Sequence, residues 1–71
     1  MRSFSTDKSN RISAMEYYPE SETLKVTFKR GGVYEYYGVP EDVYDGLIID
    51  PSLGKAFDSS IKGIYNFSRL V

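Results

Sequence analysis

The sequence predicts an α+β domain in which a three-stranded antiparallel β-meander is covered on one face by two short C-terminal helices. Three observations lead to this prediction. Residues 11–18, 23–29 and 33–39 form strand-like runs rich in β-branched and aromatic residues. Turn-forming residues separate these runs. After Pro40, apolar residues recur every three or four positions, which is typical of helices.

Length and composition limit the stability and the chemistry of the chain. It has 71 residues and forms one domain near the lower size limit for folding alone. It has no cysteine and no histidine, which excludes disulfides and zinc sites built from these residues. A core this small supplies about 3–5 kcal/mol. We therefore expect seven tyrosines and four phenylalanines to provide much of the packing, with dimer formation as a second route to stability.

The N-terminal segment is polar and rich in serine. We expect residues 1–10 to form a flexible arm and residues 11–71 to form the folded domain. The arm lacks the apolar stretch of a signal peptide. The chain also has no apolar run of about 18 residues, the length that a membrane helix needs. We expect a cytoplasmic protein without membrane contact.

The first hairpin is set by a four-residue loop over 19–22. Leu24, Val26 and Phe28 alternate with polar residues, so they share one face of the second strand. Opposed residues in a sheet also share a face, which defines the register. The predicted pairs are Tyr17 with Leu24, Met15 with Val26 and, on the far face, Glu16 with Lys25.

The second hairpin turns at Gly31 and Gly32. A two-residue turn would place Phe28 opposite Glu35 and bury a charge. We therefore predict a three-residue loop over 30–32. Its pairs are Phe28 with Tyr34, Val26 with Tyr36 and Leu24 with Gly38. Tyr34 and Tyr36 then point inward and Tyr37 points outward.

Two helices are predicted after the meander. Pro40 suits the first turn of the first helix, and Glu41 and Asp42 favour its positive end. The apolar side of this helix consists of Val43, Leu47 and Ile48.

Asp50 is the predicted N-cap of the second helix, with Pro51 next. We expect an ion pair between Asp58 and Lys62, and we expect the helix to end at Gly63. The apolar side of this helix consists of Leu53, Ala56, Phe57, Ser60, Ile61 and Ile64. In the tail that follows, Tyr65, Phe67 and Leu70 are expected to pack back on the core.

No pattern for catalysis, a cofactor or a metal emerges. The commonest catalytic bases and nucleophiles, His and Cys, are absent. Ser52 and Lys55 match the Ser-x-x-Lys motif of penicillin-binding enzymes, but its companion motifs are missing. We interpret this pair as a helix start followed by a surface lysine. Glu41, Asp42 and Asp45 are interpreted as a solvated acidic helix. We expect a non-enzymatic domain with no catalytic residue, no cofactor and no metal.

Nucleic-acid binding is indicated by the distribution of charge and not by its total. The net charge of −1 and the acidic isoelectric point argue mildly against it. From Leu53 onward, however, three bases accompany one acid, and a local basic patch can coexist with a neutral total. Tyr37 beside two lysines fits a base-stacking contact, with ordinary sheet surface as the alternative. The candidate nucleic-acid-binding residues are Lys25, Lys29, Arg30, Tyr37, Lys62 and Arg69.

The order of motifs resembles the KTSC domain family. The run from Val33 to Pro40, followed by Val43-Tyr44, is similar to the centre of that family. Further similar positions are Ser9, 12–17, 24–28, Gly32, Ser52, Gly54, Phe57, 61–63, Tyr65 and Arg69. The resemblance covers about residues 9–70. Two departures are Phe57-Asp58 and the segment 65–68, which replaces a more basic end.

The resemblance implies a small module that also occurs at the C-terminus of some lysyl-tRNA synthetases. It also implies occurrence as a separate protein in bacteria and their phages. It supplies no catalytic residue. Our first hypothesis is a binding module for RNA. The alternative is a protein-interaction module encoded by a phage or prophage, with a protein partner or a second copy of the chain, because tyrosines anchor interfaces well.

Overall fold

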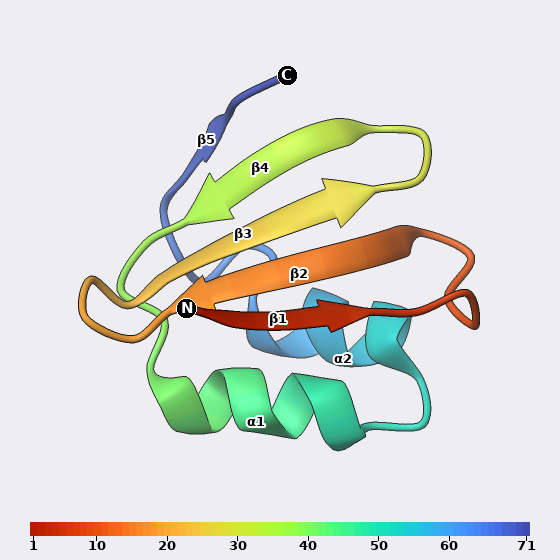
Figure 1. Ribbon diagram of the computed structural model, residues 1–71, viewed down its shortest axis with the longest axis horizontal. Helices are drawn as coiled ribbons and strands as arrows, with labels where there is room; N and C mark the ends of the chain where they lie inside the picture. The colour runs from red at the N-terminus through yellow and green to blue at the C-terminus, as the bar shows by residue number, and fades with distance from the viewer.

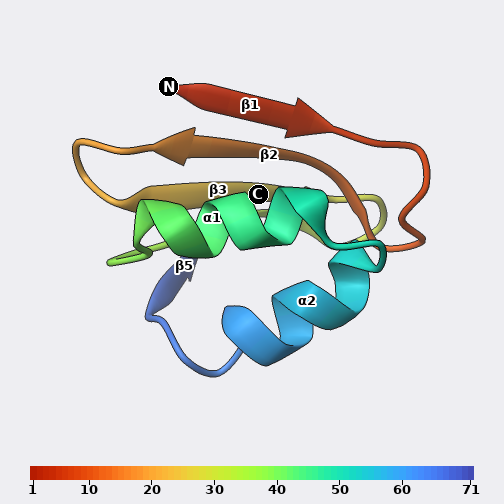
Figure 2. The ribbon, with the colours of Figure 1, turned by 90° about the horizontal axis from the view of Figure 1, so that it is seen from below.

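The computed structural model describes residues 1–71 and shows a five-stranded antiparallel sheet with two helices on one face (Figures 1 and 2). The strands follow one another in space in chain order. The elements are β1 (Arg2–Ser5), β2 (Ile12–Tyr18), β3 (Thr23–Phe28), β4 (Gly32–Tyr36), α1 (Glu41–Ile49), α2 (Leu53–Ser60) and β5 (Phe67–Arg69). The α+β class is confirmed, but the prediction of three strands is wrong because both termini add an edge strand. Neither helix is long and apolar enough to cross a membrane.

Strand β1 corrects the prediction of a loose N-terminal arm. Residues 2–5 pair with β2, and Phe4 lies opposite Met15 and packs on the core. The Arg2 guanidinium lies 4.8 Å from the ring centre of Tyr44. It also pairs with two carboxylates of α1, at 3.0 Å from Glu41 and 2.6 Å from Asp45. A strand with only one apolar residue is too short to show a periodic pattern.

The hairpin of β2 and β3 has the predicted register. Tyr17 lies opposite Leu24, Met15 lies opposite Val26, and Glu16 lies opposite Lys25. The predicted charge pair forms, with 3.4 Å between the Lys25 ammonium and a carboxylate oxygen of Glu16. The side-chain alternation along both strands therefore suffices to define this register.

The hairpin of β3 and β4 is shifted by two residues from the prediction. Val26 lies opposite Tyr34, Leu24 opposite Tyr36 and Phe28 opposite Gly32, so the loop consists of residues 29–31. A shift of two residues keeps every side chain on its predicted face, because the period of a strand is two. Gly32 begins β4, and its φ of 88° favours glycine.

Helix α1 buries Tyr44 and Leu47, while Val43 and Ile48 are half-buried. Pro40 stands at the N-cap. The prediction missed Tyr44, whose ring stacks on Tyr17 with 5.0 Å between centroids. The Tyr17 hydroxyl in turn donates a hydrogen bond to the carbonyl of Val39, just before α1. This contact ties the helix start to the middle of the sheet.

Helix α2 differs from the prediction at both ends. Its N-cap is Ser52, because Asp50 ends α1 and its carboxylate accepts a hydrogen bond from the Ser52 amide at 2.8 Å. The helix ends at Ser60, before the turn that contains Gly63. Ile64 is 60% exposed and does not belong to the apolar side. Leu53, Ala56, Phe57 and Ile61 are buried as predicted.

The C-terminal tail forms strand β5 along β4. Tyr65 packs against the core as expected, whereas Leu70 is exposed. Phe67 lies opposite Tyr36 and Arg69 opposite Tyr34. Every buried residue of the domain is apolar or tyrosine, and no buried side-chain nitrogen or oxygen lacks a hydrogen-bond partner.

Candidate nucleic-acid interface

An aromatic groove opens where α2 stops covering the sheet. It has a volume of about 350 Å³ and lies between α2 and the inner face of β3, β4 and β5. We call it the aromatic groove. Its aromatic walls are Phe28, Tyr34, Tyr36, Phe57 and Phe67, and its other lining residues are Arg11, Gly31, Lys62 and Gly63.

The rings of the groove form a connected set. Phe57 packs edge-on against Phe28 and Tyr36, with centroid separations of 5.6 and 5.4 Å. Phe67 lies 5.6 Å from Tyr34 and 5.5 Å from Tyr36 between centroids, at tilted angles. Phe67 is 57% exposed, although it takes part in this cluster. It therefore presents ring surface to solvent beside a wall that is already ordered.

Two cationic side chains, Lys62 and Arg69, lie beside the aromatic groove. The Arg69 guanidinium lies 5.7 Å from the ring centre of Tyr34 and donates to the carbonyl of Val71. Neither Arg69 nor Lys62 forms an ion pair. No acidic side chain lines the groove.

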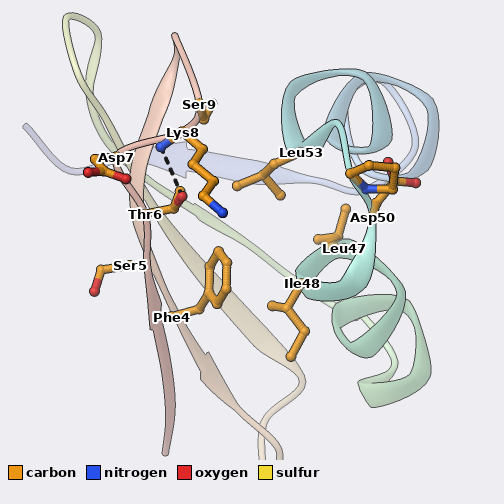
Figure 3. A pocket seen from close by; sticks show the side chains of 11 residues that line it. Phe4, Ser5, Thr6, Asp7, Lys8, Ser9, Leu47, Ile48, Asp50 and Leu53 are labelled. Atoms are coloured by element: carbon orange, nitrogen blue, oxygen red, sulfur yellow. Dashed lines mark hydrogen bonds between the residues drawn. The ribbon is translucent and has the colours of Figure 1, made fainter.

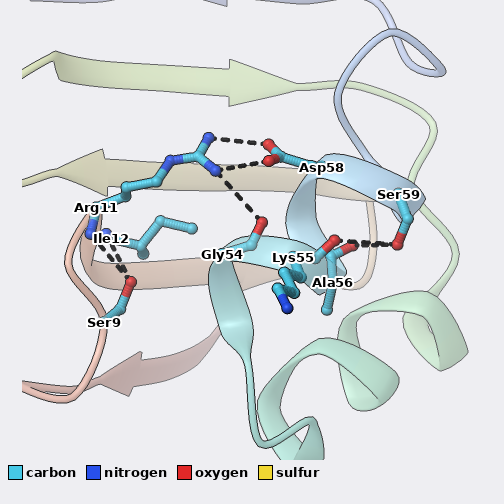
Figure 4. A network of polar contacts seen from close by, with 8 residues as sticks. All are labelled: Ser9, Arg11, Ile12, Gly54, Lys55, Ala56, Asp58 and Ser59. Carbon is cyan, nitrogen blue, oxygen red and sulfur yellow. Dashed lines mark hydrogen bonds and ion pairs between the residues drawn. The ribbon is translucent and has the colours of Figure 1, made fainter.

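Arg11 is held at the rim of the groove by Asp58. Its two terminal nitrogens lie 2.7 and 2.9 Å from the two carboxylate oxygens, and one of them also reaches the carbonyl of Gly54 (Figure 4). These hydrogen bonds hold the pKa of Asp58 below its usual value, and Lys62 adds a smaller attraction. Asp58 therefore pairs with Arg11 and not, as predicted, with Lys62.

The groove combines aromatic rings with cationic side chains. Burial raises the pKa of Tyr36 further above the ordinary tyrosine value, at which the hydroxyl is already neutral near pH 7. No group of three or more His, Cys, Asp or Glu side chains is placed to hold a metal ion. Flat rings beside unpaired cations suit a ligand that is planar and anionic.

The structure divides the six predicted nucleic-acid-binding residues between two faces. Lys62 lines the groove, and Arg69 lies over Tyr34 beside it. Lys29 and Arg30 belong to the β3–β4 turn, next to Gly31 of the groove.

Lys25 and Tyr37 lie apart from the aromatic groove. Lys25 lies opposite both Glu16 and Glu35 on the outer face of the sheet. The Tyr37 hydroxyl donates to Glu35 at 3.2 Å. Acidic neighbours therefore offset the positive charge around these two residues.

Sequence reasoning missed Arg11 and the role of the inward aromatics. Tyr34, Tyr36 and Phe57 were assigned to the core, and Phe67 to a packing tail. Their exposure in a groove depends on the position of β5, which the sequence patterns did not reveal.

A larger hollow of about 630 Å³ lies between the β1–β2 loop and the α1–α2 connection. Figure 3 shows the Lys8 ammonium group pointing into it towards Phe4 and Leu53. Asp7 and Asp50 also line this hollow. Its charges are mixed, and it has only one aromatic wall, so it is a weaker site for nucleic acid.

Sequence and structure comparisons agree on the family. A sequence profile of the KTSC domain matches residues 8–65. The chain belongs to the KTSC domain family. The crystal structure of a KTSC domain protein from Yersinia pestis is similar to this fold, with a TM-score of 0.92 and 30% sequence identity. The match covers 99% of this chain and 97% of that one. The resemblance inferred from the sequence is confirmed.

This KTSC domain is also similar to segments of larger proteins. A lysine–tRNA ligase from Nostoc punctiforme is 39% identical over 59 residues, which is 83% of this chain. The chain spans only 10% of the length of that ligase. An uncharacterized protein from Stutzerimonas stutzeri is 34% identical over 55 residues, which is 78% of each chain. The KTSC domain thus occurs as a module in lysine–tRNA ligases and in small proteins.

Proposed function

We propose that this KTSC domain is a non-catalytic module that binds single-stranded RNA in the aromatic groove. The observation that carries the proposal is the ordered ring cluster with a half-exposed Phe67, flanked by the unpaired cations Lys62 and Arg69. Aromatic side chains bind unpaired bases by stacking, at about 1–3 kcal/mol per base. Bases in a duplex are already stacked, so a groove of this kind favours single strands.

The distribution of charge supports the proposal despite the net charge of −1. Glu20 and Glu22 lie in the β2–β3 turn, and Glu41 begins α1, all at one end of the molecule (Figure 1). Lys29 and Arg30 lie in the β3–β4 turn at the other end, towards which the groove extends at Gly31. Lys29 and Arg30 therefore place positive charge at the end of the molecule towards which the groove extends, which favours an anionic ligand there.

Family context points the same way. The similar segments belong to proteins named lysine–tRNA ligase. A module beside such an enzyme has ready access to RNA, and we extend that context to this chain. The same context supports a cytoplasmic location.

The test is an amide-resolved NMR titration with a short random single-stranded RNA and, separately, total bacterial tRNA. We expect salt-sensitive shifts at Tyr34, Lys62, Phe67 and Arg69, because phosphate contacts release counterions. Shifts confined to the outer face around Lys25 and Tyr37, or no shifts with either RNA, would contradict the proposal.

The matched variants are Phe67→Ala in the groove and Tyr37→Ala on the outer face. Phe67→Ala should weaken RNA binding roughly 5- to 150-fold, which corresponds to one stacked base. Tyr37→Ala should leave the affinity unchanged. Phe67 is more than half exposed, so the fold should survive its removal.

A protein partner is the second candidate. Strand β5 is a short edge strand with unpaired backbone groups on its outer side, and Leu70 and Val71 are exposed beside it. Such an edge can accept a strand from another protein or from a second copy of the chain. Sedimentation that detects a dimer, together with RNA titrations that shift no amide, would favour this function.

A further inference from the structure

A small polar hollow adjoins the aromatic groove and shares one of its walls. It has a volume of about 240 Å³ and lies between the β1–β2 loop and the first turn of α2. Arg11 lines both the hollow and the groove. The polar donors around the hollow are Lys8, Ser9, Asn10, Ser52 and Lys55.

The hollow has an excess of positive charge. Lys8 and Lys55 form no ion pair. Asp58 is the one acidic residue of the lining, and Arg11 neutralises it through two hydrogen bonds. Lys55 is therefore uncompensated, and Lys8 adds positive charge at the border with the larger hollow, into which its ammonium group points and which Asp7 and Asp50 also line.

Ser9 contributes a hydrogen-bond donor with no acceptor in the protein. Its hydroxyl oxygen accepts from the backbone amides of Arg11 at 3.2 Å and Ile12 at 3.0 Å (Figure 4). These two bonds occupy the oxygen and leave its hydrogen free. A half-buried hydroxyl in this state suits an acceptor oxygen of a ligand.

We propose that this hollow binds a backbone phosphate of the nucleotide next to the one whose base stacks in the aromatic groove. This inference rests on the proposed function. Lys8 and Lys55 supply charge, Ser9 donates a hydrogen bond, and Arg11 stands between the phosphate and the base. The minimal ligand is therefore a dinucleotide that crosses Arg11.

The test compares the salt dependence of RNA affinity in three variants. In the double variant Lys8→Gln/Lys55→Gln, the slope of log affinity against log salt should fall by about 0.7, the value for one phosphate contact of a single strand. Phe67→Ala should lower the affinity and leave the slope unchanged. The control Lys25→Gln removes a lysine from the outer face and should change neither quantity.

The outcomes separate this inference from the proposed function. If the natural chain binds RNA and Phe67→Ala weakens binding, but the double variant keeps the full slope, the phosphate site is wrong and the groove stands. If the natural chain does not bind RNA, the proposed function and the phosphate site are both wrong. A mononucleotide that binds as tightly as a dinucleotide would also overturn the phosphate site.

Discussion

At the scale of single residues, the pair of Arg11 and Asp58 joins the start of β2 to α2 across 47 positions of sequence. The pair is solvent-exposed, so its contribution to stability is small. Its main effect is to orient the Arg11 guanidinium between the aromatic groove and the polar hollow. A carboxylate that accepts two hydrogen bonds from one guanidinium also holds that group in a defined plane.

The ion pair of Arg11 and Asp58 predicts how the stability of the domain depends on pH. The folded-state pKa of Asp58 is lowered, so its contribution to stability is present above the unfolded value of about 3.9. It is lost as the pH falls through the lowered pKa, because protons then bind the unfolded chain more readily. A carboxyl NMR titration should show the lowered pKa in the natural chain and a return towards the ordinary value in Arg11→Gln. Lys25→Gln, as control, should leave the pKa of Asp58 unchanged, and equal values in all three proteins would contradict the prediction.

At the scale of elements, β5 depends on Gly32. A side-chain Cβ at this position would lie 2.2 Å from the carbonyl oxygen of Val71. The tail is fastened beside it, since the Leu70 amide donates to the Val33 carbonyl at 2.7 Å. Because the tail approaches so closely, the first position of β4 requires a residue without a side chain, and Gly32 meets this requirement.

Gly32→Ala should therefore detach the tail. Gly38→Ala is the matched control, because Gly38 also has a positive φ, of 74°, but has no atom within 4 Å of the added Cβ. Both variants should lose about 1–2 kcal/mol from backbone strain. Only Gly32→Ala should also speed hydrogen exchange at the Leu70 amide. A Leu70 amide that stays protected in this variant would show that the tail tolerates the side chain.

The two hairpins show why one register was predictable and the other was not. In the first, a charge pair and two apolar pairs all favour one alignment. In the second, alignments that differ by two residues place the same side chains inward, so alternation cannot choose between them. In the structure Gly32 begins β4 with a φ of 88° and lies against the backbone of Val71, a contact that the hairpin sequence alone does not contain.

At the scale of the whole molecule, one core connects all the elements, and Tyr36 lies where several of them meet. Its ring contacts Phe57 of α2 and Phe67 of β5, and its neighbour on β4 is Tyr34. Only 6% of Tyr36 is exposed. A cavity at this point would weaken the contact of the sheet with both α2 and β5.

Tyr36→Ala should destabilise the domain by about 3–5 kcal/mol, as for other large buried aromatics. This equals the stability that a core of this size supplies, so the variant should be largely unfolded. Tyr37→Ala should cost at most about 0.5 kcal/mol, because Tyr37 lies on the surface. Urea unfolding followed by circular dichroism measures both, and the reverse order of the two effects would show that the face assignment of β4 is wrong.

The sequence by itself determined the α+β class, three of the five strands, both helices and the inward or outward direction of most side chains. These features follow from alternation, helical spacing and turn chemistry, which act between residues close in the chain. The charge pattern suggested Lys62 and Arg69, which lie at the aromatic groove, and also Lys25 and Tyr37, which lie on another surface.

Only the tertiary structure decided the edge strands, the register of the second hairpin and the composition of the aromatic groove. Strands β1 and β5 have four and three residues and are stabilised by pairing with β2 and β4. Their own sequences carry too little periodicity to reveal them. The groove brings Arg11, Phe28, Lys62 and Phe67 together from four separate parts of the chain. Contacts between distant segments depend on how the whole chain packs, which no local pattern specifies.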